Sequence, residues 1–153
     1  MDFEQTIKTL KISIPTLSPP QGSYVPAVKS GKIIYTSGQL PLSDGRPVFK
    51  GRVGKEVTTE NAQRAARACV VNALAAIRWL TSDLNCIKKI IRLNGYVCSA
   101  IAYNDQAKVM NAASELLIQI FGESVGTHSR VTVGVLELPL GACLEADLIV
   151  EIK

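Results

Sequence analysis

Aromatic residues and histidine are scarce in this chain of 153 residues: Phe, Trp and Tyr together make up 5%, and there is one histidine. Proteins that bind nucleic acid usually carry a continuous basic surface, with aromatic side chains where bases stack. Here the net charge is +4, from 17 basic and 13 acidic residues, and the basic residues are dispersed. The composition therefore does not favour a nucleic-acid partner.

The sequence also lacks the usual signatures of cofactor and metal sites. It contains no GxxxxGK[ST], GxGxxG or HExxH motif, and its four cysteines form no CxxC pair. His128 cannot form a metal cluster alone. We interpret it as a solvated loop residue, with a place at the mouth of a pocket as the alternative. We expect no metal and no organic cofactor.

Long apolar runs are absent as well. None approaches the roughly 20 residues that a membrane-spanning helix needs. The first residues, MDFEQTIKTLKI, lack the apolar core of a signal peptide. Widely spaced cysteines without such a signal are typical of a reducing compartment. We therefore expect a cytoplasmic protein with no membrane partner.

Hydrophobic periodicity and turn residues predict the order β-β-β-α-β-α-β-β after a short N-terminal helix. Turns are expected at Ser30–Gly31 and Asp44–Gly45, and Thr58 or Thr59 is expected to cap the first long helix. The predicted elements are a helix within 2–12, short strands within 23–53, a helix over 58–80, a strand within 86–100, a helix over 103–122 ended by Gly122, and strands over 130–138 and 143–152.

This order predicts an α+β fold, with a mixed sheet covered on one face by both long helices. Alternation in the strand from Arg130 turns three valines toward the other face, which we also expect to be apolar. At Asn94–Gly95 we expect a β-bulge rather than a hairpin turn. The chain is expected to be a single domain over residues 1–153, with an N-terminal extension over residues 1–20.

The segment HSRVTVGVLELPLGA, residues 128–142, places Arg130 at the head of a mostly apolar strand. Arginine keeps its charge, so inside a protein it needs a partner, a solvated cavity or an anionic ligand. Glu145 follows in a strand that we expect to be its neighbour. The two residues suit either a structural salt bridge or a site in which arginine binds a carboxylate and glutamate holds a water. Spacing alone leaves both open.

Three segments resemble the RidA/YjgF family: GSYVPAVKSGKIIYTSGQLPL, MNAASELLIQIFGE and SRVTVGVLELPLGACLEADLIVEI. The resemblance covers nearly the whole chain from about Gly22. It implies a chorismate-mutase-like fold and a homotrimer around a central sheet barrel. The N-terminal helix and the length are similar to those of the longer branch of the family.

The resemblance also implies an activity, the hydrolysis of reactive enamines or imines such as 2-aminoacrylate to 2-keto acids and ammonia, in clefts between subunits. Arg130 corresponds to the family's carboxylate-binding arginine and Glu145 to its water-positioning acid. Thr132 stands where the family often has cysteine. The implied substrate-binding residues are Tyr24, Ser37, Gly38, Asn111 and Thr132.

Two alternatives to this imine deaminase stay open. The same cleft could bind small carboxylates such as 2-keto acids without turning them over, as a sensor. The family's older label instead suggests an endoribonuclease or translation inhibitor, against which the dispersed charge counts.

Overall fold

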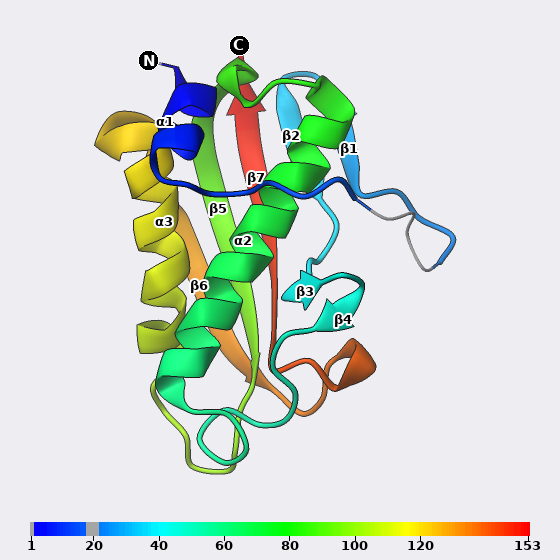
Figure 1. Cartoon of the computed structure of the whole chain (residues 1–153), viewed down its shortest axis with the longest axis vertical. Coiled ribbons are helices and arrows are strands. Elements are labelled where there is room, and N and C mark those ends of the chain that lie inside the picture. The colour runs from blue at the N-terminus through cyan, green and yellow to red at the C-terminus, as the bar shows by residue number, and fades with distance from the viewer. Residues whose placement is uncertain (1, 18–21) are drawn as a thin grey trace.

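The computed structural model describes residues 2–17 and 22–153, so residues 1 and 18–20 of the expected N-terminal extension lie outside the described part. Figure 1 shows two long helices lying across one face of a sheet. The helices are α1 (Phe3–Thr9), α2 (Thr59–Thr81) and α3 (Gln106–Gly126), with short 3₁₀ helices η1 (Leu84–Cys86) and η2 (Pro139–Gly141). The strands are β1 (Ala27–Ser30), β2 (Ile33–Thr36), β3 (Leu42–Ser43), β4 (Arg46–Pro47), β5 (Ile87–Cys98), β6 (Ser129–Val135) and β7 (Leu144–Ile152).

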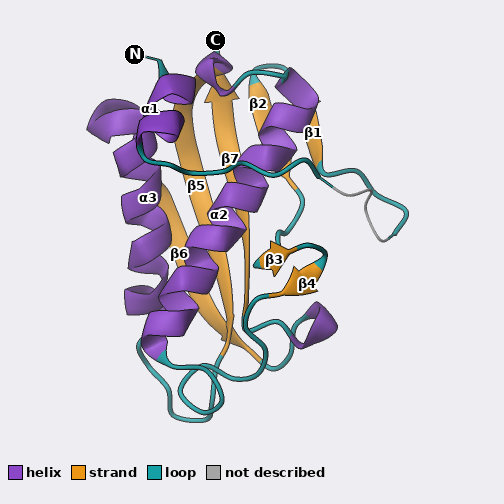
Figure 2. Ribbon diagram, viewed as in Figure 1, coloured by secondary structure: helices purple, strands orange, loops and turns teal. Residues whose placement is uncertain are grey.

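The main sheet of the described residues has five strands in the order β1-β2-β7-β5-β6. Strands β5 and β6 run parallel, joined through α3, and the other neighbours are antiparallel. β3 and β4 form a separate hairpin beside β7 in Figure 2. The sheet is therefore mixed and has both long helices on one face, which confirms the predicted α+β fold class.

The hydrophobic core lies between this sheet and the two helices. Strand β7 alternates buried and half-exposed residues along its whole length, with its buried side chains facing the helices. α2 meets them with alanines that are fully buried, and these small side chains let the helix approach the sheet closely. Gly95 serves the same purpose in β5, because a side chain there would overlap Met110 of α3.

Local turn and cap signals are confirmed. Thr58 caps α2 by accepting a hydrogen bond from the backbone N–H of Asn61 at 3.2 Å. Asp44 and Gly45, both with positive φ, form the two-residue turn between β3 and β4. The expectation that Gly122 ends the helix is wrong, because Gly122 interrupts α3 with φ 73° and the chain then makes one more helical turn up to Gly126.

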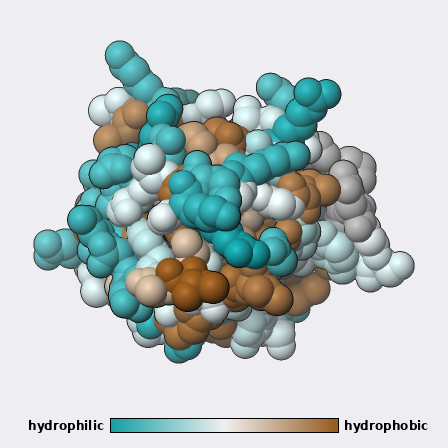
Figure 3. Space-filling view, turned by 90° about the horizontal axis from the view of Figure 1, so that it is seen from below, coloured by the Kyte–Doolittle hydropathy of each residue, from teal (hydrophilic) through white to brown (hydrophobic). Residues whose placement is uncertain are grey.

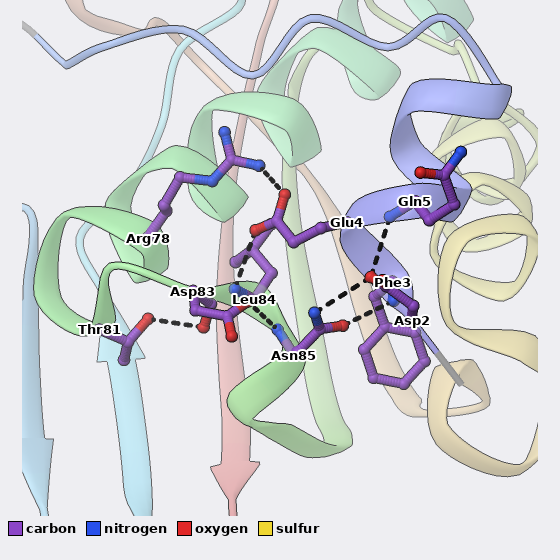
Figure 4. A network of polar contacts seen from close by, with 9 residues as sticks. All are labelled: Asp2, Phe3, Glu4, Gln5, Arg78, Thr81, Asp83, Leu84 and Asn85. Carbon is purple, nitrogen blue, oxygen red and sulfur yellow. Dashed lines mark hydrogen bonds and ion pairs between the residues drawn. The ribbon is translucent and has the colours of Figure 1, made fainter.

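A polar network fixes α1 at the end of α2 (Figure 4). Glu4 accepts a hydrogen bond from Arg78 at 2.6 Å and another from the backbone N–H of Leu84 at 3.1 Å. Asn85 accepts from the backbone N–H of Phe3 at 2.7 Å. The Phe3 ring lies edge-on to that of Phe121, with centroids 4.9 Å apart. α1 is thus part of the packed core.

Two expectations about the sheet are wrong. Asn94 and Gly95 lie in regular register with β7, and the irregularities of β5 fall earlier, between Ile87 and Lys89 and between Ile90 and Arg92. The glycine is needed for close helix packing and not for a bulge.

The face of the sheet away from the helices is not apolar. Asn94 accepts a hydrogen bond from Arg92 at 2.8 Å and donates one to Asp147 at 2.7 Å, and the Tyr96 hydroxyl donates to Asp147 at 3.2 Å. The valines of β6 do face this side, but polar residues of β5 and β7 face it as well. We call this side the open face.

Large apolar side chains are exposed at the lower end of the molecule in Figure 1. Figure 3, a view from below, shows hydrophobic surface gathered there. Ile101, Leu136 and Leu140, in the loops after β5 and β6, have exposed fractions of 96%, 81% and 51%. Exposed apolar groups in such number are typical of a surface that contacts another molecule. None of the described helices is long and apolar enough to cross a membrane.

Candidate active site

Arg130 lies on the helix-covered side of β6, opposite Leu93 of β5, and points to α3. Its guanidinium donates to Ser114 Oγ at 3.0 Å, to Asn111 Oδ1 at 3.1 Å and to the carbonyl of Ala107 at 3.2 Å. These three positions are spaced by four and three residues, so they share one face of α3. Burial lowers the pKa of Arg130 from its ordinary value, yet guanidinium stays protonated at neutral pH.

All the oxygens that bind Arg130 are neutral. None of the ion pairs formed among residues 2–17 and 22–153 includes Arg130. The structural salt bridge that the sequence left open is therefore not formed in this chain. The charge of Arg130 is thus oriented by neutral acceptors and is not neutralised by a carboxylate of the described residues.

His128 extends this arrangement by one step. Its Nδ1 lies 2.6 Å from the carbonyl oxygen of Gly126, and its Nε2 lies 3.0 Å from Ser114 Oγ. A carbonyl can only accept, so Nδ1 carries the proton, and the neutral ring then accepts the Ser114 hydroxyl proton at Nε2. Burial, with smaller contributions from Arg130 and Lys89, lowers the pKa of His128.

The interpretation of His128 as a solvated loop residue is therefore wrong. The ring is half-buried, and it fixes the hydroxyl that binds Arg130. Sequence reasoning missed Ser114 as well. The available signals were the alternation of 128, 130 and 132 along one side of a strand, and the three-residue step from Asn111 to Ser114 on a helix. We call Asn111, Ser114, His128 and Arg130 the arginine cluster.

Thr132 follows Arg130 on the same side of β6. Its hydroxyl is buried and has no hydrogen-bond partner among the described residues. A buried hydroxyl without a partner costs roughly 1–3 kcal/mol. Its expected role in substrate binding stays a prediction.

Glu145 lies on the open face of β7, opposite Tyr96 of β5. Burial, and then the nearby charge of Asp147, raise the pKa of this half-buried carboxyl group. Its carboxylate occupies the space beside Gly38 in which any larger residue would place its Cβ, so glycine is required for this contact.

The segment that carries Gly38 runs alongside β7. Gln39 exchanges two backbone hydrogen bonds with Ala146, at 2.8 and 3.0 Å. Ser37 donates its hydroxyl proton to the carbonyl of Val25 at 2.6 Å, which ties the segment to the residues before β1. Tyr24, the residue before Val25, is exposed over 55% of its surface. We call Tyr24, Ser37, Gly38 and Glu145 the glutamate cluster.

The expected site residues thus fall into two clusters. Strand β5 separates β6 from β7, and Arg130 and Glu145 lie on opposite faces of the sheet. The expectation that they occupy neighbouring strands is wrong, because β5 is inserted between them. Among the described residues there is no group of three or more His, Cys, Asp and Glu side chains that could hold a metal ion.

Three features define the class of protein: a mixed sheet with two helices on one face, an edge strand headed by an arginine that has no carboxylate partner among the described residues, and a glycine–glutamate contact on the other face. The family model for "YjgF/chorismate mutase-like, putative endoribonuclease" matches residues 4–152. The chain therefore belongs to the RidA/YjgF family.

Individual relatives agree with this assignment. Protein TCP17 of Trypanosoma cruzi is 38% identical over 96% of this chain and 92% of its own. The crystal structure of Atu1372 from Agrobacterium tumefaciens superimposes with a TM-score of 0.90 at 41% identity, over 99% of this chain and 92% of the other. TdcF of Escherichia coli, solved with bound serine, shares the fold with a TM-score of 0.67 at 21% identity, over 90% and 94% of the two chains.

Proposed function

We propose that this protein hydrolyses reactive imines and enamines that carry a carboxylate, releasing a 2-keto acid and ammonia, at clefts between copies of the chain. The observation that carries the proposal is the charge of Arg130, which three neutral oxygens orient and no carboxylate of the described chain neutralises. The carboxylate of an imino acid supplies the missing counter-charge.

Arg130 retains donors for such a ligand. Its Nε and one N–H of Nη1 make no hydrogen bond to the described residues. A carboxylate can accept two parallel hydrogen bonds, one from Nε and one from Nη2. It then takes the place of the carbonyl of Ala107, whose 3.2 Å hydrogen bond is the longest of the three. The bonds to Ser114 and Asn111 then hold the guanidinium plane in place, which lowers the entropic cost of binding.

Glu145 is suited to move the protons of the reaction. It takes a proton from a water, whose oxygen adds to the imine carbon and gives a carbinolamine. Glu145 returns this proton to nitrogen and then transfers the hydroxyl proton to the same nitrogen as the C–N bond breaks, so that ammonia leaves and the keto group forms. An enamine first takes a proton at carbon to become the imine. The raised pKa of Glu145 brings it closer to neutral pH, where a carboxyl group both accepts and returns protons effectively.

The two clusters cannot act on one small molecule within a single chain, because the sheet lies between them. In a head-to-tail assembly the arginine cluster of one copy meets the glutamate cluster of the next. The exposed apolar residues Val28, Tyr35 and Val133 on the open face, together with those at the lower end, supply surface for this contact. A cyclic trimer, as the family resemblance implies, completes three such sites.

The alternative of a carboxylate sensor uses the same cleft without turnover. The bound serine in TdcF is a small amino acid with a carboxylate, which suits either reading of the site. The word endoribonuclease in the family description adds a third candidate, for which the structure offers no specific observation.

One experiment separates these functions. A serine dehydratase generates 2-aminoacrylate in the presence of the protein, and keto acid and ammonia are followed continuously. The proposal predicts acceleration by the native protein and none by the Arg130→Ala variant. Pyruvate binding without acceleration would identify a sensor, whereas cleavage of RNA that persists in Arg130→Ala, after nucleases are removed, would identify a ribonuclease.

A further inference from the structure

A cavity of about 680 Å³ lies beside the glutamate cluster, between the N-terminal segment and the hairpin of β3 and β4. Ligand pockets in proteins commonly have volumes of about 300–1,000 Å³, so the cavity is large enough for a small molecule. Its walls come from regions far apart in the sequence: Pro15–Leu17, Tyr24 and Pro26, the hairpin, α2 and η2. It is not part of the reaction described above.

The N-terminal wall follows a helix that is anchored to the core. The network of Glu4, Arg78 and Asn85 fixes α1 against the end of α2 (Figure 4). From there the chain crosses the helix layer (Figure 1), and Ile14 and Leu17 pack against the core on the way. The cavity is therefore a product of the folded N-terminal segment and not of a loose tail.

The cavity shares two lining residues with the glutamate cluster, although Ser37 and Glu145 do not line it. Gly38 and Tyr24 line it, and both belong to the glutamate cluster. Gly38 is also the residue against which the Glu145 carboxylate lies. A molecule that reacts beside Glu145 can therefore extend past Gly38 into the cavity.

The chemistry of the walls selects which end of the molecule enters. Half of the lining residues are leucine or proline, including Leu17, Leu42 and Leu140, and the polar side chains among the others are mostly uncharged. Among the described lining residues, Asp44 is the only side chain charged at neutral pH. A carboxylate in the cavity would meet this negative charge and lose hydration without a cationic partner. The apolar end of an imino acid is favoured there instead.

We infer that this cavity binds the side chain of the substrate, so that the protein prefers imino acids with large apolar side chains over 2-aminoacrylate. The inference rests on the proposed function, since it assumes that Arg130 holds the carboxylate and Glu145 the reacting carbon. It assigns substrate selection to Leu17, Leu42 and Leu140, and it gives the N-terminal extension a role in specificity.

The test compares two stable keto acids by isothermal titration calorimetry. 4-Methyl-2-oxopentanoate has three more carbons than pyruvate, and burial of about 0.8 kcal/mol per methylene corresponds to about 50-fold tighter binding. Equal affinities for the two acids would overturn the inference. Failure of both acids to bind, or binding that Arg130→Ala leaves unchanged, would instead contradict the proposed function.

Substitutions at Leu42 test the location. Leu42→Trp fills the cavity and Leu42→Asp adds a second carboxylate, and each is expected to remove most of the preference for the longer acid while pyruvate binding stays within about threefold. Val48→Trp is the matched control, since Val48 is close in sequence and 48% exposed but does not line the cavity. Unchanged selectivity in both folded Leu42 variants, or equal loss in the Val48 variant, would contradict the assignment.

Discussion

Arg130 and Glu145 face away from each other across one β-sheet, with strand β5 between their strands. Neutral acceptors on α3 orient the guanidinium of Arg130, whereas the carboxylate of Glu145 is half-buried beside Gly38. Two halves of a site on opposite faces meet only when a second chain is present. The proposed chemistry therefore requires at least two copies of the chain.

Arg130→Lys should weaken pyruvate binding at least about tenfold, because an ammonium group is a point charge and cannot form the planar fork. The three hydrogen bonds to α3 come from the half-exposed side chain of Arg130, so their loss should change the thermal midpoint of unfolding by less than about 4 °C. Calorimetric titration and thermal unfolding check the two values. A large loss of stability with unchanged affinity would assign Arg130 to the architecture.

Ser114→Ala removes the acceptor for Arg130 Nη1 and the donor to His128 Nε2 at once. We expect pyruvate affinity to fall by about fivefold or more, because a hydrogen bond to a charged group is worth about 1.5–3 kcal/mol. Ser114→Thr keeps the hydroxyl and should restore most of the affinity. If Ser114→Thr and Ser114→Ala bind equally poorly, the hydroxyl does not position Arg130.

His128→Gln tests the histidine through pH-dependent stability. Burial lowers the pKa of His128 in the folded chain, so below about pH 6.5 the unfolded chain takes up the proton first. The histidine therefore contributes stability above that pH, and this contribution is lost as the pH falls through the lowered folded pKa. Native protein should lose thermal stability over this acidic window more steeply than His128→Gln. Because the chain has one histidine, parallel curves would show that His128 is not shielded.

Asp147→Asn tests the electrostatics around Glu145. Burial and the charge of Asp147 raise the pKa of Glu145, so removal of that charge should lower it. A base must be deprotonated to act, and activity should rise with pH through this pKa. The acidic limb of the pH–rate profile should therefore move to lower pH in the variant. Movement to higher pH, in protein whose folding is unchanged, would contradict the role of Glu145 as base.

Features encoded by neighbouring residues could be predicted from the sequence. The cap at Thr58, the positive-φ turn at Asp44–Gly45 and the alternation along β6 and β7 each depend on local backbone preferences. The fold class followed from their order. Arg130 was singled out as a charge at the head of a mostly apolar strand and Asn111 was named through the family resemblance, and the two residues lie in contact.

Features that depend on strand order could not be predicted in the same way. The last two strands are neighbours in the sequence but not in the sheet, so their alternation alone could not place Arg130 and Glu145 relative to each other. The polar open face was missed because it depends on the pairing of Asn94 with Asp147 from distant segments. His128 was misread because its partner Ser114 lies on another element.

The most direct test of a site shared between chains is complementation of two inactive variants. Arg130→Ala and Glu145→Gln are purified separately, then unfolded and refolded together at equal concentration, with each variant refolded alone as a control. Random assembly gives about one quarter of the sites an intact arginine from one chain and an intact glutamate from the next. The mixture is expected to recover up to about a quarter of native imine hydrolysis, and a mixture as inactive as either variant alone would show that Arg130 and Glu145 do not form a site between chains.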